Sequence, residues 1–153
     1  MQLPMSRNMY PEDLLQPMRA ELTQIGFEEL RTADQVEKTL PEKGTTLVFV
    51  NSICGCAARM ARPAVRQALQ QAKAKPERLT TVFAGQDKEA TDRARSYFTG
   101  YPPSSPQIGL LKDGQVVFML ERWQIEGRSA DEIAKDLVGA FDQFCAPQPA
   151  ERA

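Results

Sequence analysis

Histidine is absent from this 153-residue sequence, and cysteine occurs only three times. Without histidine the chain lacks the commonest metal ligand and the usual general base of serine and cysteine hydrolases. Three cysteines are an odd number in a chain large enough to fold without crosslinks, which argues against a secreted, disulfide-stabilised domain. Any cysteine chemistry must therefore activate its thiol without imidazole.

Long apolar runs and an excess of one charge are also lacking. Lys and Arg total 19 against 20 Asp and Glu, so the net charge of -1 gives no field for gathering nucleic acid or anionic lipid. No stretch approaches the roughly 18 apolar residues of a membrane span, and the N-terminus has no basic segment followed by an apolar core. We expect a cytoplasmic protein without nucleic-acid or membrane partners.

What is present fits one globular domain. Hydrophobic residues make up 42% of the chain and charged residues 25%, close to the averages for folded domains. A chain of this length buries one core comfortably. We expect a single domain over residues 10–145, with flexible segments at 1–9 and 146–153.

Periodicity, capping signals and turn residues predict an alternating order of elements. We expect helices over 11–25, 33–40, 57–75, 88–98 and 130–144, and strands over 27–30, 45–50, 79–84, 107–111 and 116–121. Pro17 and Pro63 should kink or break their helices, and Asp87 should cap the helix that follows it.

The strand over 45–50 is a continuous apolar and β-branched run, which is typical of a strand covered on both faces. Asp113-Gly114 predicts a hairpin, so the last two strands should be antiparallel. A mixed sheet covered by helices on both faces follows. This order predicts a thioredoxin-like α/β fold with an extra N-terminal helix.

The motif Cys54-Gly55-Cys56 lies between the expected central strand and the following helix. Free backbone N–H groups and the helix dipole at a helix N-terminus favour an anion, so a cysteine pKa falls there. A disulfide between residues two apart closes a small ring far from relaxed geometry, and glycine makes that ring sterically accessible. Such strained bonds are typical of catalytic or regulatory pairs.

We predict Cys54 as nucleophile and Cys56 as resolving thiol, although the residues alone leave the reverse assignment open. Two alternatives also stand at this point. The pair could pack as small hydrophobes in a non-catalytic binding domain, or Cys54 and Cys56 could bind or deliver a metal together with Cys145. Because zinc prefers four Cys or His ligands, we expect no metal.

Several further residues are weaker candidates for substrate binding. By analogy with thioredoxin-like folds, a cis-proline at Pro106, after Ser105, would lie beside the cysteines, whereas an ordinary trans loop proline is the alternative. Arg59 and Arg62 would stabilise a thiolate or bind an anionic thiol, unless they are solvated helix charges. For Trp123 we expect packing rather than a substrate platform.

The motifs resemble those of the bacilliredoxin family of bacterial Cys-Gly-Cys proteins. The likeness lies in Asn-Ser-Ile-Cys-Gly-Cys-Ala-Ala at 51–58 and Ala-Arg-Pro-Ala at 61–64. It extends to Tyr-Pro-Glu at 10–12, Gln-Pro-Met-Arg at 16–19, Pro-Pro-Ser-Ser-Pro at 102–106 and Ile-Glu-Gly-Arg at 125–128.

This resemblance implies a cytosolic thiol–disulfide oxidoreductase without a bound cofactor. Its co-substrate would be a low-molecular-weight thiol, typically bacillithiol, and its partners would be S-thiolated client proteins. Cys54 would take the small thiol and Cys56 would be available to resolve it, with Gly55 among the substrate-binding residues; disulfide isomerase activity is also implied. Trp123 departs from the pattern, because many relatives carry histidine there.

Overall fold

The computed structural model describes residues 10–145, so the two segments predicted to be flexible, 1–9 and 146–153, lie outside the described residues. Its centre is a five-stranded sheet in the order β1-β3-β2-β4-β5. The strands are β1 (Glu28–Glu29), β2 (Thr45–Asn51), β3 (Arg78–Phe83), β4 (Gln107–Lys112) and β5 (Gln115–Leu120).

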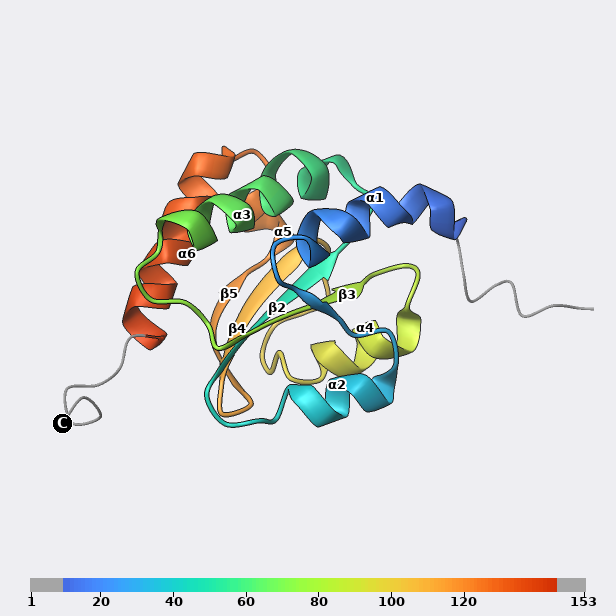
Figure 1. Cartoon of the computed structure of the whole chain (residues 1–153), viewed down its shortest axis with the longest axis horizontal. Coiled ribbons are helices and arrows are strands. Elements are labelled where there is room, and N and C mark those ends of the chain that lie inside the picture. The colour runs from blue at the N-terminus through green and yellow to red at the C-terminus, as the bar shows by residue number, and fades with distance from the viewer. Residues whose placement is uncertain (1–9, 146–153) are drawn as a thin grey trace, which may run out of the picture.

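Helices cover both faces of this sheet (Figure 1). They are α1 (Glu12–Thr23), α2 (Ala33–Thr39), a π-helical turn η2 (Ala57–Ala61), α3 (Arg62–Gln71), α4 (Lys88–Arg95), α5 (Arg122–Ile125) and α6 (Ala130–Phe144). Helices α1, α3 and α6 lie on one face, and α2 and α4 lie on the other. Within residues 10–145, no helix combines the length and apolar character needed to cross a membrane.

Strand β2 is the central strand, as the sequence predicted. All seven of its residues are buried, and it pairs in parallel with β3 and antiparallel with β4. Because side chains alternate across a strand, Leu47 and Phe49 enter the core under α1, α3 and α6, while Val48 and Val50 enter the core against α2 and α4. The strand is therefore buried on both faces.

Local sequence signals set several boundaries correctly. Thr32 and Ser129 precede the helices expected over 33–40 and 130–144, and each forms a capping box, with Gln35 and Glu132 respectively. Asp113 and Gly114 have φ of 53° and 80°, the positive values that a tight hairpin turn between β4 and β5 requires.

The helix after the cysteines differs from its prediction. It ends at Gln71 rather than at residue 75, and its first part is the π-helical turn η2. The N–H of Arg62 bonds to the carbonyl of Ala57, five residues back, so the widened turn takes up the irregularity that Pro63 imposes. Pro63 thus lies in the first turn of α3 instead of interrupting it.

Two other predictions need correction, and one element was not predicted. Helix α1 continues through Pro17, so the expected break is absent. Asp87 precedes α4, but its carboxylate makes no capping bond and instead accepts from Arg19 at 2.9 Å. The sequence analysis also missed α5, a single turn in which Glu121 and Gln124 form a capping box.

Arg19 ties α1 to the rest of the fold. Its guanidinium is 2% exposed and contacts the carboxylates of Glu12, Glu29 and Asp87 at 2.6–3.0 Å. It also lies 5.1 Å from the centre of the Phe83 ring. Burial alone would raise the pKa of Glu12, but hydrogen bonds from Arg19 and Gln86 hold it below its usual range. A buried cation with several anionic partners makes the N-terminal helix an integral part of the domain.

We expect Arg19→Met to lower the free energy of unfolding by about 3 kcal/mol, because it leaves the buried carboxylate of Asp87 with only the more distant Arg31, at 3.7 Å. Urea denaturation measures this loss. Arg66→Met, on the exposed side of α3, is the matched control and should change stability by less than about 0.5 kcal/mol. Equal effects of the two substitutions would contradict the assignment.

Candidate active site

Strand register brings three separate segments to one end of the sheet. Val50, near the end of β2, pairs with Gln107 at the start of β4. Ile108 in turn pairs with Leu120, the last residue of β5. The loop after β2 carries Cys54, the loop before β4 ends in Pro106, and β5 leads into Arg122, so these three meet at the same edge.

The two thiols differ in exposure. Cys54 is half-buried and Cys56 is 8% exposed, and both are free. Cys54 lies where the helix begins: its carbonyl accepts from the N–H groups of Ala57 and Ala58 at 3.1 and 3.2 Å, and its own N–H donates to Ser52 Oγ at 3.4 Å. The Cys54 sulfur is the more accessible of the two.

The surroundings of Cys54 favour its thiolate. Partial burial would raise its pKa, but hydrogen bonds to the Ser52 hydroxyl and the N–H groups of Ala57 and Cys56 outweigh burial, and the positive charge of Arg122 adds to them. The pKa of Cys54 is therefore below its ordinary value. Backbone donors of a helix N-terminus thus supply the activation that the missing histidine would otherwise provide.

Cys56 has the opposite bias. Burial raises its pKa, and the negative charges of the Cys54 thiolate and Glu126 raise it further, while Arg122 opposes them. One thiol is thus ionised in preference to its neighbour, a division suited to a nucleophile and a resolving thiol. This arrangement favours the predicted roles of Cys54 and Cys56, which remain predictions.

Arg62 is not the solvated helix charge that one alternative expected. It is 2% exposed, and its guanidinium donates to Glu21, to Asn51 Oδ1 and to the carbonyl of Ser52 at 2.8–3.1 Å. Asn51 Oδ1 also accepts from the Ser52 N–H at 2.9 Å. Arg62 therefore fixes the backbone from which the Cys54 loop starts.

Arg59 is exposed and lies over Gly55. A Cβ added at Gly55 would come within 2.9 Å of an Arg59 guanidinium nitrogen. The φ of Gly55 is not in the left-handed region, and the close atoms are the far end of a flexible, exposed side chain, so the contact places Arg59 beside the motif without requiring glycine. The absence of a side chain lets Arg59 fold back over the motif.

Pro106 is in the cis form, the first of the two conformations that the sequence left open, and it is buried beside the half-buried Ser105. Two side chains, one from α4 and one from the start of β4, donate hydrogen bonds to the loop before it. Arg95 donates to the carbonyl of Ser104 at 2.8 Å, and Gln107 donates to that of Pro102 at 3.2 Å. The proline loop therefore keeps a defined position beside the thiols.

The sequence analysis missed Arg122. Its side chain donates to the Ser105 carbonyl at 3.3 Å, its backbone N–H donates to Ser104 Oγ at 3.3 Å, and it forms an ion pair with Glu126 at 3.5 Å. The thiolate of Cys54 is the strongest influence raising the pKa of Arg122. No sequence motif marks this residue, because it reaches the thiols only through the pairing of β4 with β5.

Trp123 is 73% exposed, so the expected packing is wrong; its indole N–H donates to Glu121 at 3.3 Å. The Cys145 thiol lies close to Thr45 at the start of β2, the end opposite Cys54, and β2 alone spans roughly 20 Å. It therefore cannot join the other two cysteines in a metal site. Among the described residues, no three Cys, Asp or Glu side chains gather closely enough to hold a metal ion.

Comparisons with known proteins decide the family. A family model described as disulphide isomerase matches residues 10–145. A bacilliredoxin of Koribacter versatilis is 60% identical over 138 residues, which cover 90% of this chain and 94% of that protein. The chain belongs to the bacilliredoxin family. A bacilliredoxin of Geobacillus kaustophilus is 53% identical over 137 residues, covering 89% of this chain and 94% of the relative.

Solved structures show the same fold. The thioredoxin-like domain of Arabidopsis NCP superposes with a TM-score of 0.54 at 20% identity, covering 83% of each chain. The predicted thioredoxin-like α/β fold is thus confirmed. Together with its bacilliredoxin relatives, this fold identifies the chain as a thiol–disulfide oxidoreductase.

Alkylation of the two thiols should separate with pH. In Cys56→Ser, the rate of Cys54 modification by iodoacetamide should reach half its maximum below about pH 8.5, because the lowered pKa preserves the thiolate at lower pH. In Cys54→Ser, the midpoint for Cys56 should lie above that of Cys54. Stopped-time labelling with peptide-level mass spectrometry, which separates these sites from the free Cys145, measures both, and the reverse order would refute the assignment.

Arg62→Ala should lower the free energy of unfolding by about 2 kcal/mol or more. It removes the buried guanidinium and leaves the acceptors on Glu21, Asn51 and Ser52 without their donor. Arg59→Ala, on the exposed side of the same turn, should cost less than about 0.5 kcal/mol. Parallel urea melts test the pair. Similar losses of stability in the two variants would show that the buried contacts of Arg62 do not stabilise the fold.

Proposed function

We propose that the chain removes a low-molecular-weight thiol of the bacillithiol type from mixed disulfides on client proteins. Cys54 is the nucleophile and Cys56 the resolving thiol. The observation that carries this proposal is the opposite bias of the two neighbours: a half-buried Cys54 with a lowered pKa beside a buried Cys56 with a raised pKa.

In the first step, the Cys54 thiolate attacks the small-thiol sulfur of the mixed disulfide. A new S–S bond forms between Cys54 and the small thiol while the bond to the client breaks, and the electron pair leaves on the client sulfur. A thiolate is the attacking species in every such exchange, so its stabilisation at the helix N-terminus maintains the reactive fraction near neutral pH.

In the second step, Cys56 loses its proton and attacks Cys54 Sγ. The small thiol departs as a thiolate, and a disulfide joins Cys54 and Cys56. The charge of the Cys54 thiolate, which raises the pKa of Cys56, has disappeared once Cys54 is bonded to the small thiol, so ionisation of Cys56 becomes easier at this stage. A dithiol, or two molecules of the small thiol that leave joined as their own disulfide, then reduces the pair.

The proposed setting is the cytoplasm, where the surroundings keep thiols reduced between turnovers. The partners are S-thiolated proteins, and the small thiol is a co-substrate rather than a bound cofactor. The same nucleophile also suits isomerisation, since Cys54 can attack a client disulfide and be released by another client thiol without net oxidation.

Single-cysteine variants test the two roles. With a peptide carrying bacillithiol in a mixed disulfide, Cys54→Ser should lose essentially all dethiolation, because no thiolate remains at the helix N-terminus. Cys56→Ser should accumulate an adduct of bacillithiol on Cys54, which mass spectrometry detects. Full activity of Cys54→Ser, or an adduct located on Cys56, would overturn the assignment.

The identity of the small thiol is tested with the wild-type protein. The same peptide linked to glutathione is the control, and we expect the bacillithiol-linked peptide to react with the higher kcat/KM. Equal or faster release of glutathione would contradict the bacillithiol part of the proposal and leave the thiol exchange itself standing.

A further inference from the structure

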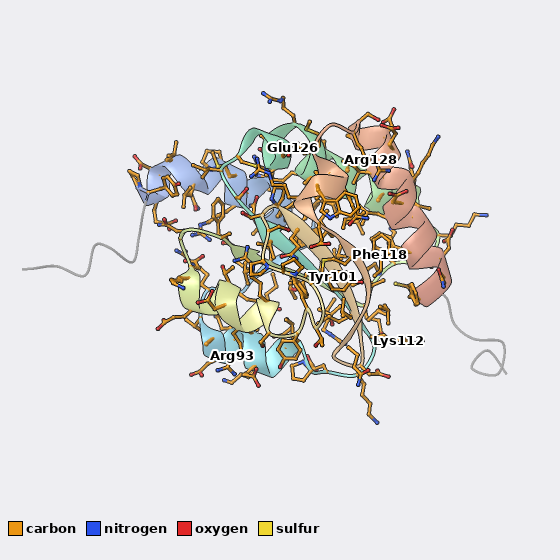
Figure 2. All side chains as sticks on the ribbon, turned by 180° about the vertical axis from the view of Figure 1, so that it is seen from behind. Arg93, Tyr101, Lys112, Phe118, Glu126 and Arg128 are labelled. Carbon is orange, nitrogen blue, oxygen red and sulfur yellow. The ribbon has the colours of Figure 1, made fainter. Side chains whose placement is uncertain are left out.

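Arg122 lies where the thiols and the proline loop meet. It is the first residue of α5, and both its backbone N–H and its guanidinium bond to the loop, at Ser104 Oγ and at the Ser105 carbonyl. In Figure 2, the nearby Glu126 and Arg128 lie at this end of the hairpin, whereas Lys112 lies at the far end. These contacts hold the positive charge of Arg122 against Ser105, the residue that precedes Pro106.

The charge of Arg122 has two main partners. The thiolate of Cys54 is the stronger, and the second is Glu126, whose ion pair is long at 3.5 Å and whose side chain is 57% exposed. Arg122 itself is 43% exposed. A guanidinium has five N–H donors, so one carbonyl and one distant carboxylate leave it able to bind another anion.

The reaction removes the stronger partner. When Cys54 forms its disulfide with the small thiol, the negative charge moves from Cys54 to the departing client sulfur. Arg122 then faces a neutral disulfide, and of its two main anionic partners only Glu126 remains. A carboxylate on the small thiol would replace the lost charge at the same place, next to the sulfur that Cys54 now holds.

We propose that Arg122 recognises an acidic group on the small thiol and so directs Cys54 to the small-thiol sulfur rather than to the client sulfur. The inference rests on the proposed dethiolation and adds the chemical class of the preferred leaving group. Arg62 is unsuited to this part because its guanidinium is buried against Glu21, Asn51 and Ser52. Arg59 lies over Gly55 and makes no hydrogen bond to the proline loop within the described chain.

Two isosteric probes isolate the charge. One fluorescent peptide is linked through a disulfide to 3-mercaptopropionate, and the other is linked to 3-mercaptopropionamide, which differs only in lacking the negative charge. We expect the wild type to prefer the acid. Arg122→Gln should lower kcat/KM for the acid by about tenfold while the amide loses less than about threefold.

The ratio of the two rates is the deciding quantity, because any effect of Arg122 on the reactivity of Cys54 changes both probes equally. Arg122→Lys should restore part of the preference. Arg128→Gln is the matched control: Arg128 pairs with Asp136 at 2.8 Å on the neighbouring helix, and its loss should leave the ratio unchanged.

A second measurement reports which sulfur is attacked. In Cys56→Ser, mass spectrometry should find mercaptopropionate on Cys54, and adding Arg122→Gln should shift the adduct toward the peptide. An unchanged rate ratio with an unchanged adduct, or loss of the preference in Arg59→Gln instead, would overturn the inference. Failure of the wild type to cleave either probe would instead overturn the dethiolation on which the inference rests.

Discussion

The pairing of β2 with β4, and of β4 with β5, is the constraint on which the site depends. It sets the end of β2, the start of β4 and the end of β5 at one edge of the sheet. Each strand is followed or preceded there by a different chemical part: the thiols, the cis-proline loop and Arg122. A slip of one residue in this register would turn each strand's side chains to the opposite face, so the hydrophobic core and the site are specified together.

Once these parts are adjacent, electrostatics divides the labour between two chemically identical side chains. Cys54 has the hydroxyl of Ser52 and backbone donors around it, whereas Cys56 is buried and faces the charges of Cys54 and Glu126. The division needs no imidazole. It follows from position along the first turn of a helix. Cys54 faces the free N–H groups of that turn, whereas Cys56, two residues later, lies in the protein interior.

Much of this fold could be predicted from the sequence because its signals are local. The apolar run of β2, the capping boxes at Thr32 and Ser129 and the Asp113-Gly114 turn each lie within a few residues. The position of the cysteine pair after β2 was predictable for the same reason, since it needs only the strand and the helix beside it.

The parts that escaped prediction depend on contacts between distant residues. Arg59 and Arg62 were natural candidates because they are close to Cys54 in sequence, yet a helix turns one of them into the interior and leaves the other outside. Arg122 is 68 positions beyond Cys54 in the numbering and comes near it only through two strand pairings. Similarly, Asp87 looked like a helix cap, but a buried cation from α1 offered its carboxylate a stronger partner.

The exposure of Trp123 has a practical consequence. It is the only tryptophan in the sequence, it is 73% exposed, and it directly follows Arg122. The indole emission of this chain therefore comes from a solvated position at the end of the sheet that carries the thiols, not from the hydrophobic core. Fluorescence in solution can follow events at this edge, such as thiol modification or approach of another molecule, without an attached dye.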